Sequence, residues 1–95
     1  MQREAILQTL SAHKPELSAK YGVTRLGIFG SVARGEASSA SDVDIVVEMP
    51  PDLFMMVHMK EDLEDILAAP VDLIRYSRFL NDTLKRRIDH DAIYV

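Results

Sequence analysis

Two stretches of the chain, LGIFGSVAR (residues 26–34) and SDVDIVV (residues 41–47), decide the fold class. Each holds a short run of large or β-branched apolar residues, which is typical of a buried strand. Gly30 and Ser31 close the first run, and ten residues separate Ser31 from Asp42, where the second run begins. The pattern therefore predicts two strands that carry small and acidic residues at their ends.

The N-terminal part of the chain is predicted to be helical. Apolar residues recur at helical spacing between Arg3 and Ala12. Pro15 is expected to end this helix and to open a short second one, because proline lacks a backbone N–H but suits a first helical position. Gly22 is expected to stop that second helix.

The second half of the chain predicts a long helix that ends near Ala69, a strand at Val71–Ile74, a helix at Arg78–Asp89 and an extended segment at Ala92–Val95. The apolar face of the long helix is expected to consist of Leu53, Met56, Val57, Leu63, Ile66 and Leu67. The fold class is α/β in the mixed α+β sense. Residues 1–95 are expected to form a single domain, with a short mixed sheet of about three strands packed against helices.

The predicted topology brings the polar strand ends together. A short connection between the first two strands allows them to run antiparallel, and a strand–helix–strand unit should be parallel and right-handed. Ser31 at the end of the first strand, Asp42 and Asp44 at the start of the second, and Asp72 at the start of the third then meet at one edge of the sheet.

These residues suit phosphate chemistry. Asp42 and Asp44 point to the same face of a strand and repel each other unless cations compensate. Two Mg²⁺ ions would do so, and Mg²⁺ commonly completes its shell with substrate phosphates. Gly30 permits close approach of a phosphate to the backbone, and Ser31 offers a hydroxyl donor. Arg34 either binds the same phosphates or pairs only with Glu36.

The spacing of Gly30-Ser31 and Asp42-Val43-Asp44 resembles the signature of the DNA polymerase β-like nucleotidyltransferase superfamily. GIFGSVARGE (residues 27–36) with SDVDI (residues 41–45) is similar to the minimal nucleotidyltransferase group, whose members act as antitoxins to HEPN ribonuclease toxins. The resemblance covers essentially the whole chain. It implies a three-carboxylate site at Asp42, Asp44 and Asp72, two Mg²⁺ ions, and adenylylation of a tyrosine on a partner HEPN toxin with ATP as substrate.

Composition limits the other function classes. With 47% hydrophobic and 27% charged residues the chain is expected to fold, and without cysteine it has no disulfide and no thiolate metal site. The net charge of −4 argues against nucleic acid as the main partner. No signal peptide or membrane span is expected, so the expected location is the cytoplasm. The oligomeric state, as a homo- or hetero-oligomer, stays open.

Other residues have ordinary structural interpretations. His13, His58 and His90 lack the spacing of a metal site. Met55 and Met59 lie one helical turn apart and are more often core than a partner contact. The run KRR (residues 85–87) suits the C-terminal end of a helix, and a role in holding an acidic partner stays open.

The sequence is compatible with two functions. The first is a nucleotidyltransferase that uses Asp42, Asp44 and Asp72. The second is a non-catalytic antitoxin that neutralises its partner by contact alone. An intact carboxylate cluster favours the first, because clustered charge is costly to keep without a cation. In a chain of this size the acceptor is expected to bring its own surface, which favours a protein acceptor.

Overall fold

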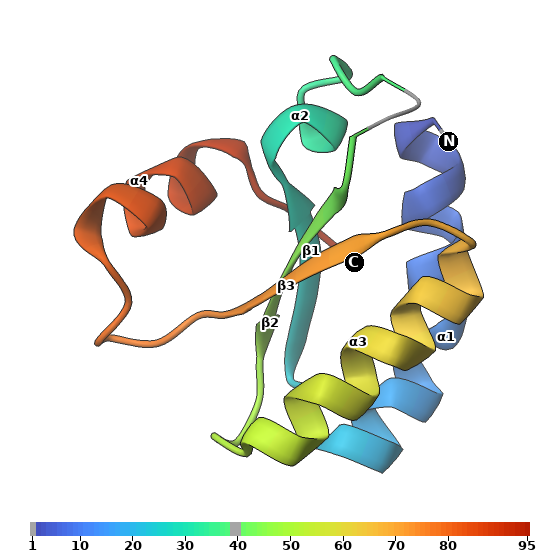
Figure 1. Ribbon diagram of the computed structural model, residues 1–95, viewed down its shortest axis with the longest axis vertical. Coiled ribbons are helices and arrows are strands. Elements are labelled where there is room, and N and C mark those ends of the chain that lie inside the picture. The colour runs from blue at the N-terminus through green and yellow to red at the C-terminus, as the bar shows by residue number, and fades with distance from the viewer. Residues whose placement is uncertain (1, 39–40) are drawn as a thin grey trace.

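The computed structural model describes residues 2–38 and 41–95. The described chain folds into four strands and four helices (Figure 1). In chain order the elements are α1 (Arg3–Tyr21), β1 (Arg25–Phe29), α2 (Gly30–Ala33), β2 (Val43–Glu48), α3 (Leu53–Leu67), β3 (Val71–Arg75), α4 (Asp82–Asp91) and β4 (Ile93–Tyr94). No helix within the described ranges is long and apolar enough to span a membrane.

The strands form one mixed sheet in the order β3-β2-β1-β4. β1 pairs antiparallel with β2, and β2 pairs parallel with β3 across α3, so both predicted strand pairings are confirmed. The extended segment at the end of the chain adds a fourth strand, because β4 pairs antiparallel with β1. Gly27 makes this pairing possible, since a Cβ atom there would overlap the Ile93 carbonyl oxygen and the Tyr94 ring.

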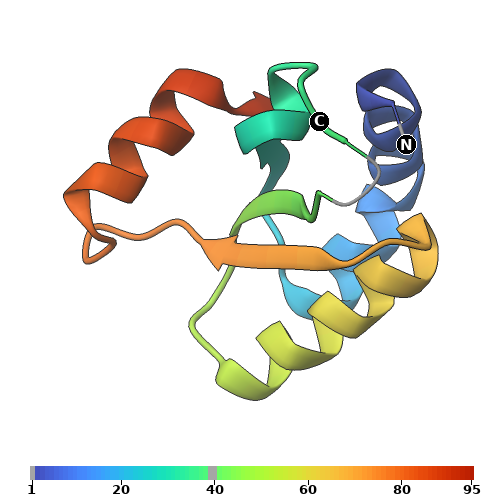
Figure 2. The ribbon, with the colours of Figure 1, turned by 45° about the horizontal axis from the view of Figure 1, so that its top comes forward.

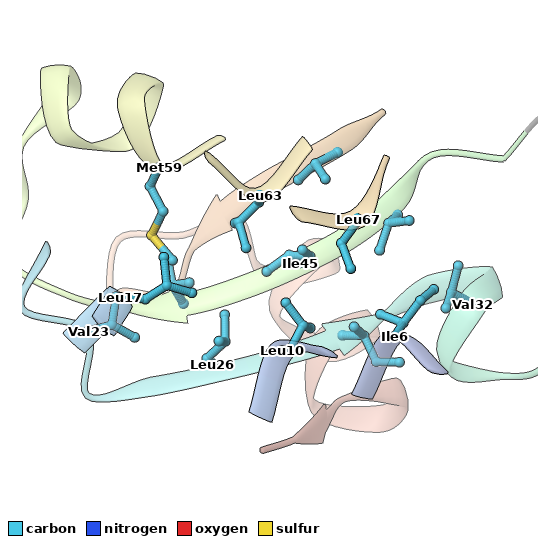
Figure 3. Close-up of a cluster of buried hydrophobic side chains, with 14 of the residues drawn as sticks. Ile6, Leu10, Leu17, Val23, Leu26, Val32, Ile45, Met59, Leu63 and Leu67 are labelled. Carbon is cyan, nitrogen blue, oxygen red and sulfur yellow. The ribbon is translucent and has the colours of Figure 1, made fainter. Parts of the chain in front are cut away.

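The helices divide between the two faces of the sheet. α1 and α3 lie together on one face, whereas α4 lies on the other side, next to α2 (Figures 1 and 2). The main core fills the space between α1, α3 and the sheet (Figure 3). A smaller core of Phe29, Val46 and Ile88 holds α4 against the opposite face. Both faces of the central strand β2 are therefore covered.

The prediction that Pro15 separates two helices is wrong, because α1 continues through it to Tyr21. The buried residues Ile6, Leu10, Leu17 and Tyr21 lie on both sides of Pro15 and on one face of a continuous helix. Packing of this face offsets the hydrogen bond that proline cannot donate. Gly22 ends α1 in the left-handed conformation, with φ of 72°, as predicted.

The predicted apolar face of α3 is also partly wrong. The buried residues are Met59, Leu63 and Leu67, whereas Leu53 and Val57 are 77% and 50% exposed. The first turns of α3 are apolar on several sides, so only docking against α1 and the sheet decides which side is buried. A joint partner contact through Met55 and Met59 is excluded as well, because Met59 lies in the core.

The last helix begins later than predicted, at Asp82 rather than at Arg78. Asn81 is the reason, because its side chain accepts hydrogen bonds from the backbone N–H groups of Thr83 and Leu84 and caps the helix there. Phe79, which falls within the predicted helix Arg78–Asp89, lies before the observed helix and is 84% exposed. Ile88 is the buried anchor of α4.

Met59→Ala should destabilise the protein by about 2–5 kcal/mol, because it leaves a cavity in the core. Met55→Ala removes the same atoms one turn earlier on α3, where the side chain is partly exposed, and should change the free energy of unfolding by less than about 1 kcal/mol. Urea denaturation of both variants measures the difference. Equal losses for the two variants would contradict the assignment of Met59 to the core.

Candidate active site

The register of the sheet places two aspartates side by side. Asp44 is the direct partner of Asp72 in the parallel pair β2–β3 and of Phe29 in the antiparallel pair β1–β2. Val43 and Ile45 point into the main core, whereas Val46 packs with α4. Alternation along the strand therefore puts Asp44 on the face that α4 covers. The convergence expected from the topology brings Asp44 and Asp72 together on this face.

Asp42 lies at the entrance of β2 rather than within it, because the strand begins at Val43. Its residue is exposed, whereas Asp44 is half-buried. The Asp42 charge still acts on Asp44 and contributes to raising its pKa. The three predicted carboxylates thus differ in burial: Asp44 is half-buried, whereas Asp42 and Asp72 are exposed.

Gly30 is the first residue of α2 and has a positive φ of 72°. A Cβ atom at this position would overlap the carboxylate oxygen Oδ2 of Asp44. Glycine was expected here to let a phosphate approach, but the structure adds a more immediate reason, which is that Asp44 already occupies the space. Gly30 is therefore required both by its backbone conformation and by the neighbouring carboxylate.

Ser31 follows at the first turn of α2 and is partly exposed. Within residues 2–38 and 41–95 its hydroxyl makes no hydrogen bond to another side chain or to the backbone. The first N–H groups of a helical turn also lack partners within the helix. The end of β1 thus presents a hydroxyl and backbone donors next to Asp44, which is an arrangement that can bind an anion.

The surroundings of Asp44 disfavour the ionised form of its carboxyl group. Burial, and after it the neighbouring Asp72 carboxylate, raises the pKa of Asp44 above its usual value, while Arg87 and Arg34 act in the opposite direction. A carboxylate with a raised pKa is one whose ionised form lacks sufficient compensation. A cation placed beside Asp44 would supply that compensation.

Arg34 is engaged by two carboxylates. Its Nε donates to Glu36 at 3.0 Å, and its Nη1 donates to Asp91 at 2.6 Å. The Asp91 side chain is only 6% exposed, so this second contact links the end of α2 firmly to α4. The pairing with Glu36, one of the two alternatives for Arg34, is present together with the Asp91 contact, and a phosphate at Arg34 would have to share the guanidinium with both partners.

The carboxylates fit a magnesium ion that is shared with a substrate. Among residues 2–38 and 41–95, no group of three or more acidic, histidine or cysteine side chains converges to hold a metal ion alone. Mg²⁺ is usually bound by one or two carboxylates together with substrate phosphates, rather than by a cage of protein ligands. Adjacent Asp44 and Asp72, with an anion-binding turn beside them, match that pattern.

Comparison with known proteins places this chain in a family. The model of the nucleotidyltransferase domain matches residues 10–95. The chain is a member of the nucleotidyltransferase domain family. It is 39% identical over 94 residues to the protein adenylyltransferase MntA of Thermococcus cleftensis, a match that covers 97% of this chain and 94% of that protein. As a nucleotidyltransferase, it has its acidic strand pair and its Gly30-Ser31 turn within the matched region.

Solved structures agree with the fold. A protein proposed to be a minimal nucleotidyltransferase is 34% identical, with a TM-score of 0.73 and coverage of 98% of this chain and 95% of that one. A chain from a complex of a tri-AMPylated HEPN toxin with an MNT antitoxin, from Shewanella oneidensis, has a TM-score of 0.68 at 18% identity and covers 98% of this chain and 71% of that one. This nucleotidyltransferase thus has the fold of the minimal type.

Two residues near the site could not be predicted from the sequence. Asp91 holds Arg34 although 57 positions separate them, and Arg87 acts on Asp44 from α4. No motif in the sequence links α4 to the strand ends. The packing of Ile88 against Phe29 and Val46, together with the Arg34–Asp91 contact, brings that helix to the site.

Asp44→Asn should raise the melting temperature at pH 7 in buffer with a metal chelator. The raised pKa means that the folded protein binds the proton more tightly than the unfolded chain does, so stability falls as pH rises above about 4. The gain from Asn should therefore shrink towards pH 4 and below, where Asp44 itself is protonated. Glu61→Gln makes the same charge change on an exposed part of α3 and is the control. A rise in melting temperature that does not depend on pH, or no rise at all, would contradict the raised pKa of Asp44.

Gly30→Ala and Gly35→Ala form a second matched pair, since both glycines have a positive φ. A Cβ atom at Gly35 meets nothing closer than Arg3 Nη1 at 3.9 Å, so that variant should lose only the backbone strain of about 1–2 kcal/mol. Gly30→Ala should lose more, because it also displaces Asp44. Thermal unfolding measures both, and similar losses would show that the Asp44 carboxylate can move aside freely.

Proposed function

We propose that this nucleotidyltransferase transfers AMP from ATP to a tyrosine hydroxyl of a partner HEPN toxin, in a reaction that depends on Mg²⁺. The observation that carries the proposal is the register of Asp44 with Asp72, directly beside the Gly30-Ser31 turn. This arrangement offers metal ligands and phosphate donors at one place. The choice of a protein as the acceptor is supported by similar proteins and by exposed apolar side chains.

The side chains divide the work of the reaction. Mg²⁺ held by Asp42, Asp44 and Asp72, two ions in all, would neutralise the phosphate charge and lower the pKa of the acceptor hydroxyl. The Ser31 hydroxyl and the backbone N–H groups of the turn donate hydrogen bonds to phosphate oxygens, and Arg34 adds a positive charge beside them. The contribution of the protein is positioning and charge compensation, with no covalent intermediate on a side chain.

ATP and AMP transfer are supported by the relatives. The Thermococcus cleftensis protein is a protein adenylyltransferase by name, and a protein of Methanocaldococcus jannaschii proposed to have the same activity is 38% identical over 92 residues. Both matches span 94% of those proteins, so the similarity extends over nearly the whole of each.

A protein acceptor is supported by exposed apolar side chains. Leu53, Phe54 and Phe79 are 77%, 79% and 84% exposed, and such side chains are usual at protein interfaces. The complex of an MNT antitoxin with an AMPylated HEPN toxin, which shares this fold, supplies the class of partner. These exposed side chains also favour the second candidate function, which is neutralisation of the toxin by contact alone.

Transfer of label from α-³²P-ATP to the partner toxin tests the proposed activity. Asp44→Asn and Asp72→Asn should each reduce the rate at least about 100-fold, because each removes a metal ligand. Glu61→Gln should keep the rate, and a chelator should abolish it. Full transfer by Asp44→Asn would overturn the assignment of the site.

The double variant Asp42→Asn/Asp44→Asn separates the two candidate functions in cells that produce the toxin. If catalysis protects the cell, protection should be lost while the complex, measured by co-purification, survives. Protection at native expression level with binding unchanged would establish neutralisation by contact and sink the enzymatic proposal.

A further inference from the structure

A groove runs between α2 and α4, on the side of the sheet that carries Asp44. It has a volume of about 510 Å³ and is lined by Arg34, Thr83, Arg86, Arg87, His90 and Asp91. On α4, Arg86 and Arg87 each lie three or four positions from both Thr83 and His90, so these lining residues form one face of that helix. The opposite face of α4 carries Ile88 into the smaller core. The helix therefore turns its basic side towards α2.

The groove is positive in a chain whose net charge is −4. Arg34 is shared between Glu36 and Asp91, and Asp91 is also contacted by His90 at 2.9 Å. Arg86 and Arg87, by contrast, have no carboxylate within 4.0 Å among the residues that the structure describes. At least two guanidinium groups are thus available for an anion that enters the groove.

The groove lies next to the acidic strand ends. Ile88 packs on Phe29, the cross-strand partner of Asp44, and on Val46, two residues further along β2. Arg87 precedes Ile88 on α4 and lines the groove together with Arg34. Arg34 approaches from α2, which begins at Gly30 against the same carboxylate. An anion bound between α2 and α4 would therefore lie on the same face of the sheet as the proposed metal ions.

We propose that the groove between α2 and α4 binds the terminal phosphates of the nucleoside triphosphate, with Arg87 as the residue that donates to their oxygens. The inference rests on the proposed function and assigns the triphosphate tail to residues outside the Gly30-Ser31 turn. A guanidinium binds two phosphate oxygens at once, which suits Arg87 better than a point charge would. Asp91 acts as a positioning residue, because it holds Arg34 at the wall of the groove.

Isothermal titration calorimetry of the full chain with AMP-PNP and with AMP, both in the presence of Mg²⁺, tests the inference. Arg87→Gln should weaken AMP-PNP binding about 10- to 100-fold, and AMP binding less than about 3-fold, because AMP lacks the terminal phosphates. Arg87→Lys should recover part of the loss. Arg78→Gln, which removes an exposed arginine that lies on the Phe79 ring, should change neither affinity.

Each other outcome overturns a defined claim. If the wild-type protein binds AMP-PNP but Arg87→Gln binds it equally well, the groove is not the phosphate subsite and the proposed activity survives. Equal weakening for AMP and AMP-PNP also rejects the subsite, as does loss of toxin binding with nucleotide affinity unchanged. If the wild-type protein binds no AMP-PNP, the proposed function itself fails. Circular dichroism checks the fold, and Arg87→Met replaces Arg87→Gln if the latter is unfolded.

Discussion

The register between β2 and β3 is the constraint on which the rest of the site depends. Residues on a strand alternate between faces, so a slip by one position would place Val71 or Leu73 beside Asp44 and turn a core residue outward. The main core prevents such a slip, because α1 and α3 bury one complete face of β2. The apolar packing of one side thus fixes the acidic pair on the other side.

The adjacent carboxylates of Asp44 and Asp72 destabilise the folded protein, and packing in the rest of the fold offsets this loss. Asp44 is half-buried beside Asp72, and among the described residues the charges of Arg87 and Arg34 favour its ionised form. Local strain of this kind is typical of functional sites, where a sequence breaks the rules that hold in the rest of the molecule. Gly30 serves two purposes at this site. Its lack of a side chain makes room for the Asp44 carboxylate, and its backbone conformation turns the chain into α2.

The strands and the acidic edge could be predicted because they follow from local patterns and chain topology. Short apolar runs bounded by glycine or proline mark β1 and β2, and a parallel strand after a helix must begin at the same edge of the sheet as the preceding strand. The continuation of α1 through Pro15 and the buried side of α3 could not be predicted, because packing against distant residues decides both. The Arg34–Asp91 contact joins segments with no shared motif, so the contribution of α4 to the site emerged only from the structure.

β3 is an edge strand of the described sheet, and its outer hydrogen-bonding groups face away from β2. Open edges of this kind invite pairing with a strand from another molecule, and charged side chains on the edge discourage it. Asp72 is an exposed charge on this strand. The Asp72 carboxylate beside Asp44 therefore also disfavours edge-to-edge pairing with another molecule, so one side chain belongs both to the candidate site and to the sheet edge.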